Sequence, residues 1–455
     1  MRVAIIGTGY VGLVSGACLA HKGHIVQCVD IDHRKIDMIN SRRPPIHEAG
    51  LEDVLASVVP ERLSATADLA AAVNGADLTM IAVGTPFNGS EIDLTYIEKA
   101  AWQIGEALAT KDEYHVVVVK STVVPGTTET VVLPILERAS GKKAGIDFGV
   151  GMNPEFLKEG EAIADFMNPD RVVIGGIDDA SIDRQAELYS PFPGVDIVRT
   201  TPSTAEMVKY TSNALLATLI SFSNEIGNTS AALGVDAMEV MKGVHLDKRF
   251  SPILPDGQRV RPGMLSYLAP GCGFGGSCFP KDVKSIIAHG QRLGQPMRLL
   301  EAVASVNADQ PSQMINMLEG RFRELRGLKV AVLGMAFKPG TDDVRESPAI
   351  AVTRTLIDKG VQVVGYDPIA RSAAQAILPE VVEFEENLAA AVADADAILI
   401  MTAWAELRAL PAMLADMDTP PVLIDGRRLI DKSAVRDYLA IGLPTTREFS
   451  PVEPA

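Results

Sequence analysis

The segment MRVAIIGTGYVGLVSGACLA (1–20) decides the fold of this chain. It opens with a short β-branched run, which is followed by a turn with three glycines and by apolar residues at helical spacing, Val11–Leu19. A second strand-like run, Ile25–Val29, ends at Asp30. Strand, glycine turn, helix and strand in this order predict the first βαβ unit of a parallel sheet.

The glycine turn has the spacing G-x-G-x-x-G. Such glycines let the backbone turn tightly and approach a pyrophosphate, which lies at the N-terminus of the following helix. The pattern alone is weak, because its glycines also serve close packing of strand against helix. Between a strand and a helix it predicts a dinucleotide site. The residues of the turn expected at the cofactor are Gly7, Gly9, Tyr10, Val11 and Gly12.

Asp30 stands where the second strand ends, 18 residues after Gly12. A carboxylate at this position accepts hydrogen bonds from the hydroxyls of an adenosine ribose and repels a 2′-phosphate, which favours NAD over NADP. Arg34 and Lys35 follow closely and weaken this preference. We therefore predict NAD as the cofactor.

The composition is that of an ordinary globular protein, since 47% of the 455 residues are hydrophobic and 22% are charged. The net charge of −16 argues against generic binding to nucleic acid or to an anionic membrane, although a local cluster of Lys and Arg still allows an anionic ligand. We recognise no cleavable signal peptide, and no apolar stretch reaches the roughly 18 residues of a membrane span. Four cysteines are few for a secreted chain of this length, so we expect a cytoplasmic protein.

Further strand-like runs alternate with helical patterns, which indicates parallel sheets with right-handed crossovers. These runs are Leu78–Val83, Val116–Val119, Lys329–Gly334, Val361–Tyr366, Ala397–Met401 and Val422–Ile424. The run Lys329–Gly334 (KVAVLG) repeats Arg2–Gly7 (RVAIIG), so a second Rossmann-type domain is predicted. The turn after Gly334 lacks the full glycine pattern, and we expect the fold to repeat there without the cofactor site.

Between these two domains, Thr204–Leu233 keeps helical periodicity without proline and is much longer than an average helix of ~11–12 residues. We interpret it as a long helix that connects the two domains and as a dimer surface. The prediction is an α/β protein with two Rossmann-type doubly wound parallel-sheet domains, residues 1–200 and 316–455, joined by a long central helix and a helical middle region, residues 201–315. The tail PTTREFSPVEPA is expected to be disordered.

The stretch GCGFGGSCFPKD (271–282) is the most unusual of the chain. Four glycines within six residues predict a backbone that a ligand approaches closely. If a helix begins near Pro280, Cys278 lies at its N-terminus, where the helix dipole and Lys281 favour the thiolate. The i, i+4 spacing places Asp282 on the side of Cys278.

A thiolate beside a nicotinamide suggests oxidation of an alcohol to an acid. The sulfur adds to the intermediate aldehyde, a second hydride leaves, and water hydrolyses the resulting thioester. Two alternatives stay open: a buried structural thiol, and a disulfide between Cys272 and Cys278. No metal site is predicted, because the seven histidines show no ligand-like spacing with the cysteines.

Over nearly its whole length the chain resembles the UDP-glucose 6-dehydrogenases, within the wider UDP-glucose/GDP-mannose dehydrogenase family. The resemblance rests on GTGYVGL (7–13), VGTP (83–86), KSTVVPGT (120–127), NPEFLKEGEAIADFMNPDRVVIG (153–175), AEMVKYTSNALLATLISFSNEI (205–226), GFGGSCFPKD (273–282), GMAFKPGTDDVRESPA (334–349), YDP (366–368) and DGRR (425–428). It implies an NAD-binding N-terminal domain, a central helix that dimerises and a C-terminal domain that binds UDP. The activity it implies is four-electron oxidation of UDP-glucose at C6 to UDP-glucuronate.

The resemblance also implies roles for single residues. Cys278 looks like the nucleophile that carries the thiohemiacetal and the thioester. Asp282 and Thr122 look like the pair that positions the catalytic water and assists proton transfer. Lys209 and Asn213 look like donors to the developing C6 oxyanion. They are four residues apart on one predicted helix, although this spacing is also that of an ordinary solvated helix face.

By the same resemblance, Glu159 is similar to the candidate general base of thioester hydrolysis, and Glu155 to a residue near the sugar. The implied cofactor contacts beyond the glycine turn are Asp30, Lys35, Thr85, Thr122 and Arg345. The implied substrate contacts are Glu155, Phe156, Leu157, Lys209, Asn213, Arg249, Phe274, Gly275, Lys338 and Arg427. For the loop cations Lys338, Arg345 and Arg427, solvated surface charge is the alternative.

One segment departs from the family pattern, because the path from Arg249 to Cys278 is longer. The family's substrate-contacting arginine, supplied by the dimer partner, maps best to Arg249, and Arg259 and Arg261 are alternatives.

The sequences NPEFLKEG and GFGGSCFPKD favour UDP-glucose over GDP-mannose or UDP-N-acetylmannosamine as the substrate. A non-catalytic sensor of NAD or a nucleotide sugar would need the glycine turn but not Cys278, Lys209 and Asp282 together. We therefore expect an NAD-dependent enzyme acting on UDP-glucose, as a homodimer or a higher homo-oligomer.

Overall fold

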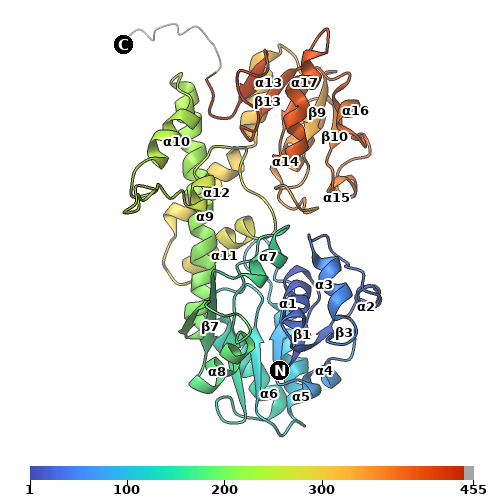
Figure 1. Ribbon diagram of the computed structural model, residues 1–455, viewed down its shortest axis with the longest axis vertical. Coiled ribbons are helices and arrows are strands. Elements are labelled where there is room, and N and C mark those ends of the chain that lie inside the picture. The colour runs from blue at the N-terminus through green and yellow to red at the C-terminus, as the bar shows by residue number, and fades with distance from the viewer. Residues whose placement is uncertain (445–455) are drawn as a thin grey trace. The chain divides into compact units, whose positions relative to one another are not determined.

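The computed structural model describes residues 1–444, and the end of the tail predicted to be disordered lies outside this part. The chain forms two compact units, both drawn in Figure 1. The first unit comprises Met1–Ser212 and Lys284–Gln295, and the second comprises Asn213–Val283 and, of the described residues, 296–444.

The first unit is built around an eight-stranded sheet of order β3-β2-β1-β4-β5-β6-β7-β8. Its strands are β1 (Arg2–Ile6), β2 (Ile25–Val29), β3 (Leu63–Thr66), β4 (Leu78–Ile81), β5 (His115–Val119), β6 (Phe148–Met152), β7 (Arg171–Gly176) and β8 (Asp196–Thr200). All neighbours are parallel except β6 and β7. The strand order reverses between β1 and β4, which is the topology of a doubly wound sheet.

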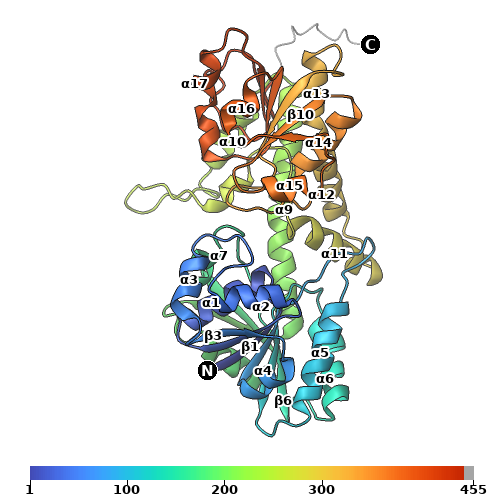
Figure 2. The same cartoon turned by 90° about the vertical axis from the view of Figure 1, so that its right-hand side faces the viewer.

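Helices cover both faces of this sheet. They are α1 (Tyr10–His21), α2 (His33–Asn40), α3 (Leu51–Val58), α4 (Leu69–Gly75), α5 (Thr95–Leu108), η1 (Thr128–Val132), α6 (Leu133–Ser140), α7 (Ala162–Met167) and α8 (Asp179–Leu188). Val3 and Ile5 of β1 pack with α1, α3 and α7, whereas Ala4 and Ile6 pack with α4, α5 and α6. Figure 2 shows α5 and α6 together on one face. The strands are therefore apolar on both sides, and β4 and β5 are buried along their whole length.

The helix predicted over Thr204–Leu233 is confirmed as α9 (Pro202–Ala232). The helical elements that follow are α10 (Ala237–His245), η2 (Gly263–Tyr267), α11 (Phe279–Arg292), α12 (Arg298–Asp309) and α13 (Ser312–Arg321). Within residues 1–444, no helix has both the length and the apolar character to span a bilayer.

The second unit carries a six-stranded parallel sheet of order β11-β10-β9-β12-β13-β14. Its strands are β9 (Lys329–Leu333), β10 (Gln362–Tyr366), β11 (Glu383–Phe384), β12 (Ala397–Ile400), β13 (Val422–Asp425) and β14 (Tyr438–Ala440). Its remaining helices are α14 (Pro348–Asp358), α15 (Arg371–Gln375), α16 (Leu388–Val392), η3 (Ala405–Ala409) and α17 (Leu410–Ala415). The predicted α/β architecture with two Rossmann-type sheets is confirmed.

The two sheets repeat one backbone contact at the end of their first strand. The Gly7 N–H donates to Val29 O at 2.7 Å, and the Gly334 N–H donates to Tyr366 O at 2.7 Å. Both glycines have positive φ, +101° and +94°. The same turn therefore leaves β1 and β9, and each turn contacts the strand next to it.

The carboxylate after the second strand is used differently in the two sheets. Asp30 follows β2, and Asp367 is its counterpart after β10. Asp367 is buried and accepts five hydrogen bonds. Their donors are the N–H groups of Met335, Ala336, Ile369 and Ala370 and the indole N–H of Trp404. A carboxylate has about four lone-pair sites, so Asp367 is saturated inside its own domain. This accounts for a fold that repeats without a second ribose acceptor.

We expect Asp367→Asn to lower the free energy of unfolding by about 2 kcal/mol or more, because the amide NH₂ would face donors that now point at Oδ2. A urea titration followed by the fluorescence of Trp404 in a Trp102→Phe background measures this change. Asp394→Asn is the matched control, since that side chain is 85% exposed. Equal urea midpoints for the two variants would refute a stabilising role of Asp367.

Candidate active site

Each glycine of the turn after β1 has its own structural reason. A Cβ on Gly7 would come within 2.7 Å of Ala82 O, and a Cβ on Gly12 within 2.0 Å of Gly7 O. At Gly9, where φ is −69°, a Cβ would meet no protein atom within 4 Å. Gly7 and Gly12 are therefore needed for packing. The open side of Gly9, at the N-terminus of α1, is a cradle that fits a pyrophosphate.

Asp30 is fixed by the same turn. Its Oδ2 accepts hydrogen bonds from the N–H and the hydroxyl of Thr8 at 2.9 and 2.5 Å, and its Oδ1 accepts from the Asp32 N–H at 3.0 Å. Burial raises the pKa of Asp30, but these hydrogen bonds and Lys35, whose Nζ lies 4.0 Å away, lower the pKa below its usual value overall. Asp30 is thus ionised at neutral pH, as an acceptor for ribose hydroxyls must be.

Tyr10 ties the first turn of α1, which also contains Val11, to the loop before α7. Its hydroxyl donates to Glu48 and accepts from the Gly160 N–H at 3.0 Å. Glu48 also accepts from the N–H groups of Gly160 and Ala162 at 2.7 and 2.8 Å. Burial and the neighbouring Glu48 raise the pKa of Tyr10, which keeps the phenol protonated. Sequence reasoning missed Glu48, because its partners are distant along the chain.

Thr85 and Thr122 lie just beyond the carboxyl ends of the neighbouring strands β4 and β5, the edge at which doubly wound sheets bind ligands. The Thr85 hydroxyl donates to Thr122 O at 2.8 Å. Beside them, the Ser121 hydroxyl donates to Val83 O at 2.7 Å. The structure therefore brings these two predicted residues together at the ligand edge of the first sheet.

Glu155 and Lys209, both predicted near the substrate, form a buried ion pair. The Lys209 Nζ lies 2.9 Å from Glu155 Oε1, and the two side chains are 4% and 6% exposed. Glu155 Oε2 accepts from the Leu157 N–H at 2.7 Å. Burial raises the pKa of Glu155, but Lys209 lowers it below its usual value overall, so the carboxylate is ionised. Glu159 is buried in the same loop, where its charge acts on Tyr10.

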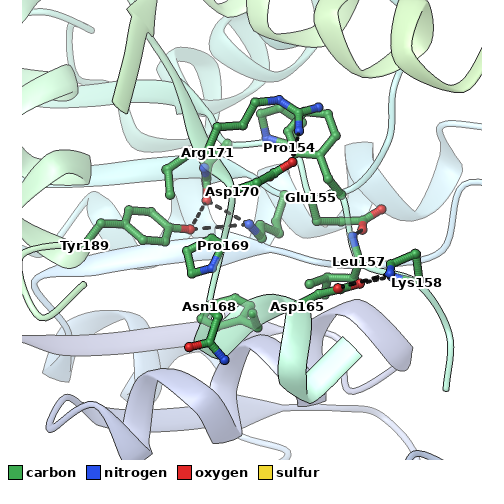
Figure 3. Close-up of a pocket in the computed structure, with 15 residues that line it drawn as sticks. Pro154, Glu155, Leu157, Lys158, Asp165, Asn168, Pro169, Asp170, Arg171 and Tyr189 are labelled. Atoms are coloured by element: carbon green, nitrogen blue, oxygen red, sulfur yellow. Dashed lines mark hydrogen bonds and ion pairs between the residues drawn. The ribbon is translucent and has the colours of Figure 1, made fainter. Parts of the chain in front are cut away.

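The loop that follows β6 lines a cavity of about 230 Å³ in the first unit (Figure 3). Two cations face the ring of Phe156, with the Arg171 guanidinium 3.8 Å and the Lys209 Nζ 5.6 Å from its centroid. The cavity brings together the predicted residues Glu155, Phe156 and Leu157. It also contains polar residues that sequence reasoning missed, among them Lys120, Asn153, Arg171 and Tyr189.

In the second unit, Cys278 directly precedes α11, as the sequence predicts. The thiol is half-buried, with its Sγ 3.6 Å from Ser277 Oγ. The carbonyl of Cys278 accepts from the Asp282 N–H at 2.9 Å, which places the thiol at the N-terminal end of the helix. All four cysteines are free, so the alternative of a disulfide between Cys272 and Cys278 is wrong. Cys272 is instead buried, with its Sγ 3.6 Å from Met401 O.

Asp282 lies one helical turn after the thiol and is 1% exposed. Its Oδ2 accepts from Asn213 Nδ2 at 2.6 Å, and its Oδ1 lies 2.5 Å from Lys281 Nζ. Asn213 and Asp282 were predicted in separate roles, and the structure makes them direct partners. The hydrogen bond from Asn213 fixes the orientation of the carboxylate near the start of α11.

The glycines of the cysteine loop pack against the protein itself. A Cβ on Gly275 would lie 2.3 Å from Glu346 O, and a Cβ on Gly276 would lie 2.8 Å from the ring of Phe337. The Gly276 N–H donates to Arg345 O at 2.8 Å. At these two glycines the segment 337–346 therefore approaches the backbone of the loop closely, and the contact of Gly275 with the substrate stays a prediction.

Amide side chains fix the other side of this loop. Asn224 Oδ1 accepts from the Gly271 N–H at 2.8 Å, and Gln310 Nε2 donates to Gly271 O at 2.7 Å. Asn307 makes two hydrogen bonds with the backbone of Phe274, at 2.8 and 3.0 Å. Sequence reasoning missed these amides, because helix amides carry no signal of the distant loop that they contact. Phe274, a predicted substrate contact, is thus held through its backbone.

Arg427, a predicted substrate contact, donates to three carbonyls. Its Nε lies 2.6 Å from Met401 O, and its terminal nitrogens lie 3.2 and 3.4 Å from the carbonyls of Gly273 and Phe337. Lys338 Nζ lies 5.8 Å from the ring centroid of Phe337. Arg427 therefore joins the cysteine loop to the segments that follow β9 and β12.

Arg345 and Arg249 each form a two-point ion pair with an aspartate two residues earlier. Arg345 pairs with Asp343 at 2.8 and 2.9 Å, and Arg249 pairs with Asp247 at distances from 2.6 to 3.1 Å. The Arg249 side chain is 81% exposed. Both arginines stay predicted ligand contacts.

The arginines of the longer segment before the cysteine loop differ in their surroundings. Arg259 donates to the carbonyls of Leu246 and Ser251 at 2.6 and 3.0 Å, so it holds the base of a turn around Gly257. Arg261 is exposed. Arg259 is therefore held by its own segment, and the assignment of Arg249, Arg259 or Arg261 to a contact with a partner stays a prediction.

A dinucleotide cradle in one unit and a thiol at the start of a helix in the other define an NAD-dependent oxidoreductase. The three domain models of the UDP-glucose/GDP-mannose dehydrogenase family match the chain: the NAD binding domain over residues 1–193, the central domain over residues 203–309 and the UDP binding domain over residues 331–432. The chain belongs to this family.

Individual relatives agree with this family assignment. The UDP-glucose 6-dehydrogenase AglM of Haloferax volcanii is 42% identical over 96% of this chain and 99% of its own length. The GDP-mannose 6-dehydrogenase of Azotobacter vinelandii is 44% identical over 81% of each chain. The structure of a UDP-glucose dehydrogenase from Pyrobaculum islandicum is similar with a TM-score of 0.87 and 38% identity, over 97% of this chain and 98% of that one.

The glycine turn gives a prediction that separates binding from folding. We expect Gly9→Ala to fold normally but to raise the Kd for NAD by about tenfold or more, because its methyl group would occupy the side that a pyrophosphate approaches. We expect Gly12→Ala to lose on the order of 2 kcal/mol or more of stability, because its methyl group would overlap Gly7 O. Thermal melting with NAD titration measures both effects. A Gly9→Ala variant that melts early and binds NAD normally would contradict the assignment.

Proposed function

We propose that this protein oxidises the C6 alcohol of UDP-glucose to a carboxylate, with two NAD consumed for each UDP-glucuronate formed. The observation that carries the proposal is the half-buried Cys278 at the start of α11, with Asp282 one turn further along. A single oxidation to an aldehyde needs no thiol, whereas oxidation of an aldehyde to an acid uses a covalent adduct.

Two features of the first unit fit NAD: the open side of Gly9 and the ionised carboxylate of Asp30. NAD, when bound, supplies the hydride acceptor for both oxidations. In the first oxidation, a hydride leaves C6 and the proton of its hydroxyl passes to solvent through the water held by Asp282 and Thr122, while Lys209 stabilises the negative charge that develops on the oxygen. Asn213 shares this task through its amide N–H.

In the second oxidation, the Cys278 thiolate adds to the C6 aldehyde, and the oxygen takes up a proton to give a thiohemiacetal. Loss of the proton and of a second hydride gives a thioester on the same sulfur. Asp282 and Thr122 orient a water, Glu159 removes its proton, and the thioester is hydrolysed to carboxylate and free Cys278. Each turnover thus consumes one alcohol, one water and two NAD.

UDP-glucose is favoured over GDP-mannose by the extent of the alignments, since the domain model that matches residues 331–432 belongs to the family that contains both kinds of enzyme. The UDP-glucose relative from Haloferax volcanii aligns over 96% of the chain, whereas the GDP-mannose relative from Azotobacter vinelandii aligns over 81%. We assign the nucleotide to the second unit, where Lys338 and Arg427 are the predicted contacts.

We further propose that the enzyme works as a homodimer in the cytoplasm. Large apolar side chains remain exposed on α9 at spacings of eight and seven residues, which places them on one side of the helix. They are Met207, Leu215 and Phe222. Free cysteines suit a reducing compartment. Arg249, exposed in this structure, is the first candidate to reach the partner's substrate.

The test of the function is the yield of NADH from a limiting amount of nucleotide sugar. We expect two NADH for each UDP-glucose, with UDP-glucuronate as the product. Two NADH from GDP-mannose or UDP-N-acetylmannosamine, and none from UDP-glucose, would keep the chemistry and change the substrate. One NADH with every sugar would refute the role of Cys278.

The cysteine itself gives a separate prediction. We expect Cys278→Ser to form at most one NADH for each sugar and no uronate, because a serine hydroxyl is not ionised at neutral pH and adds poorly to the aldehyde. Cys272→Ser is the matched control and is expected to keep the yield of two NADH. Full uronate production by Cys278→Ser, measured by mass spectrometry, would overturn the mechanism.

A further inference from the structure

A second lysine lies beside the buried pair of Glu155 and Lys209. Lys120 directly follows β5 and is 3% exposed. Its Nζ donates to Asn153 Oδ1 at 2.8 Å and contacts Tyr189 Oη at 3.4 Å. The Tyr189 hydroxyl donates to the same Asn153 oxygen at 2.5 Å. The hydrogen bonds of this buried ammonium therefore go to two neutral groups.

The carboxylate whose charge acts on Lys120 is that of Glu155, although Glu155 forms its ion pair with Lys209. Both side chains line the cavity drawn in Figure 3. Burial lowers the pKa of Lys120 to about 8, Glu155 acts in the opposite sense, and Lys209 lowers the pKa further. Lys209 and Lys120 both help to keep the pKa of Glu155 low despite its burial. Lys120, Glu155 and Lys209, called here the charge cluster, thus place two cations around one buried carboxylate.

The other charged groups at this cavity form ion pairs with one another. Arg171 lies over the ring of Phe156 and pairs with Asp170 at 2.9 Å. Lys158 lies 3.4 Å from Asp165 and 2.5 Å from Glu161, outside the charge cluster. Tyr189 stays protonated, because burial raises its pKa. Lys120, with its pKa of about 8, therefore loses its charge just above neutral pH.

The proposed reaction needs the ammonium of Lys209 at the C6 oxygen of the substrate rather than beside Glu155. If Lys209 turns its ammonium toward the C6 oxygen, it must weaken its contact with Glu155. A buried carboxylate left without a counter-ion is strongly unfavourable. A second cation that stays beside Glu155 removes most of this penalty, because it can remain at Asn153 while Lys209 moves.

We propose that Lys120 is a positioning residue of the oxidation: it remains the counter-ion of Glu155 and thereby frees Lys209 for the substrate oxygen. This inference rests on the proposed function, since it takes the role of Lys209 from there. Lys120 acts through Glu155 and Lys209, and its effect falls on the transition state, where the charge on the C6 oxygen is greatest.

The test replaces Lys120 by methionine and by arginine. We expect Lys120→Met to lower kcat by about tenfold or more at pH 7, with KM for UDP-glucose within about twofold, because only a transition-state interaction is weakened. Lys120→Arg keeps a permanent positive charge and is expected to restore most of kcat. If the methionine variant fails to fold, Lys120→Gln, which retains a donor for Asn153, takes its place.

The pH profile separates a charge role from a packing role. Lys120 is protonated below its pKa near 8, so the wild-type kcat should fall as pH rises through that value. In Lys120→Arg this decrease should move to higher pH, and in Lys120→Met kcat should be low on both sides of pH 8. Superimposable profiles for the wild type and the arginine variant would overturn the proposal.

Glu155→Gln supplies a double-mutant test. Once the carboxylate is removed, Lys120 has no counter-ion role, so Lys120→Met should change kcat by less than about twofold in that background. An equal loss of kcat in both backgrounds would mean that Lys120 acts through packing alone. Two NADH for each sugar from the wild type must be measured beside these variants, because a wild type without that yield refutes the proposed function instead.

Lys111 offers a matched control. It is a buried lysine of the same unit whose pKa is also lowered by burial, and it donates to the carbonyls of Val73, Asn74 and Ala76 at the end of α4. We expect Lys111→Met to lower the melting temperature without moving the pH profile of kcat. A loss of the pH-dependent decrease of kcat in Lys111→Met, as expected for Lys120→Met, would overturn the inference.

Discussion

The hydrogen bond from the glycine after the first strand to the end of the neighbouring strand is the contact on which both sheets depend. It joins Gly7 to Val29 and Gly334 to Tyr366, at 2.7 Å in each case. Only a residue that tolerates positive φ turns the chain at this point and still leaves room for the adjacent strand. One backbone solution is therefore used twice, and the difference between the domains lies in the side chains around it. In the first sheet Asp30 keeps acceptor capacity for a ribose, whereas in the second Asp367 is saturated.

The sequence was sufficient to predict most of the fold, because buried parallel strands and a long uninterrupted helix leave strong periodic patterns. It did not predict β6, whose residues Gly149 and Gly151 are poor strand formers. In the structure the missing side chains make room for Tyr114 and Gln185 from neighbouring segments. Such compensation is a tertiary effect, so no local pattern indicates it. The edge strand β8 was missed for a different reason, since it is largely exposed and lacks an apolar run.

The candidate site, like the fold, has some features that local sequence predicts and others that it does not. Cys278 at the start of a helix follows from a local motif, and so do the open Gly9 and the carboxylate of Asp30. Contacts between segments that are distant in the sequence could not be predicted. Glu48 is an example, because it binds Tyr10 and the loop before α7. In the cysteine loop, the lack of side chains at Gly275 and Gly276 makes room for the chain's own backbone and ring, a packing reason that the composition of the loop does not indicate.

The saturation of Asp367 also bears on how such a chain can evolve. A carboxylate follows the second strand of both sheets, and in the second sheet it has a structural task. Each of its five donors comes from a different residue, so no single substitution frees the carboxylate. Removal of the carboxylate would leave all five donors without an acceptor. Freeing Asp367 to accept hydrogen bonds from a ribose would therefore need several substitutions together, because the same carboxylate holds its own domain in place.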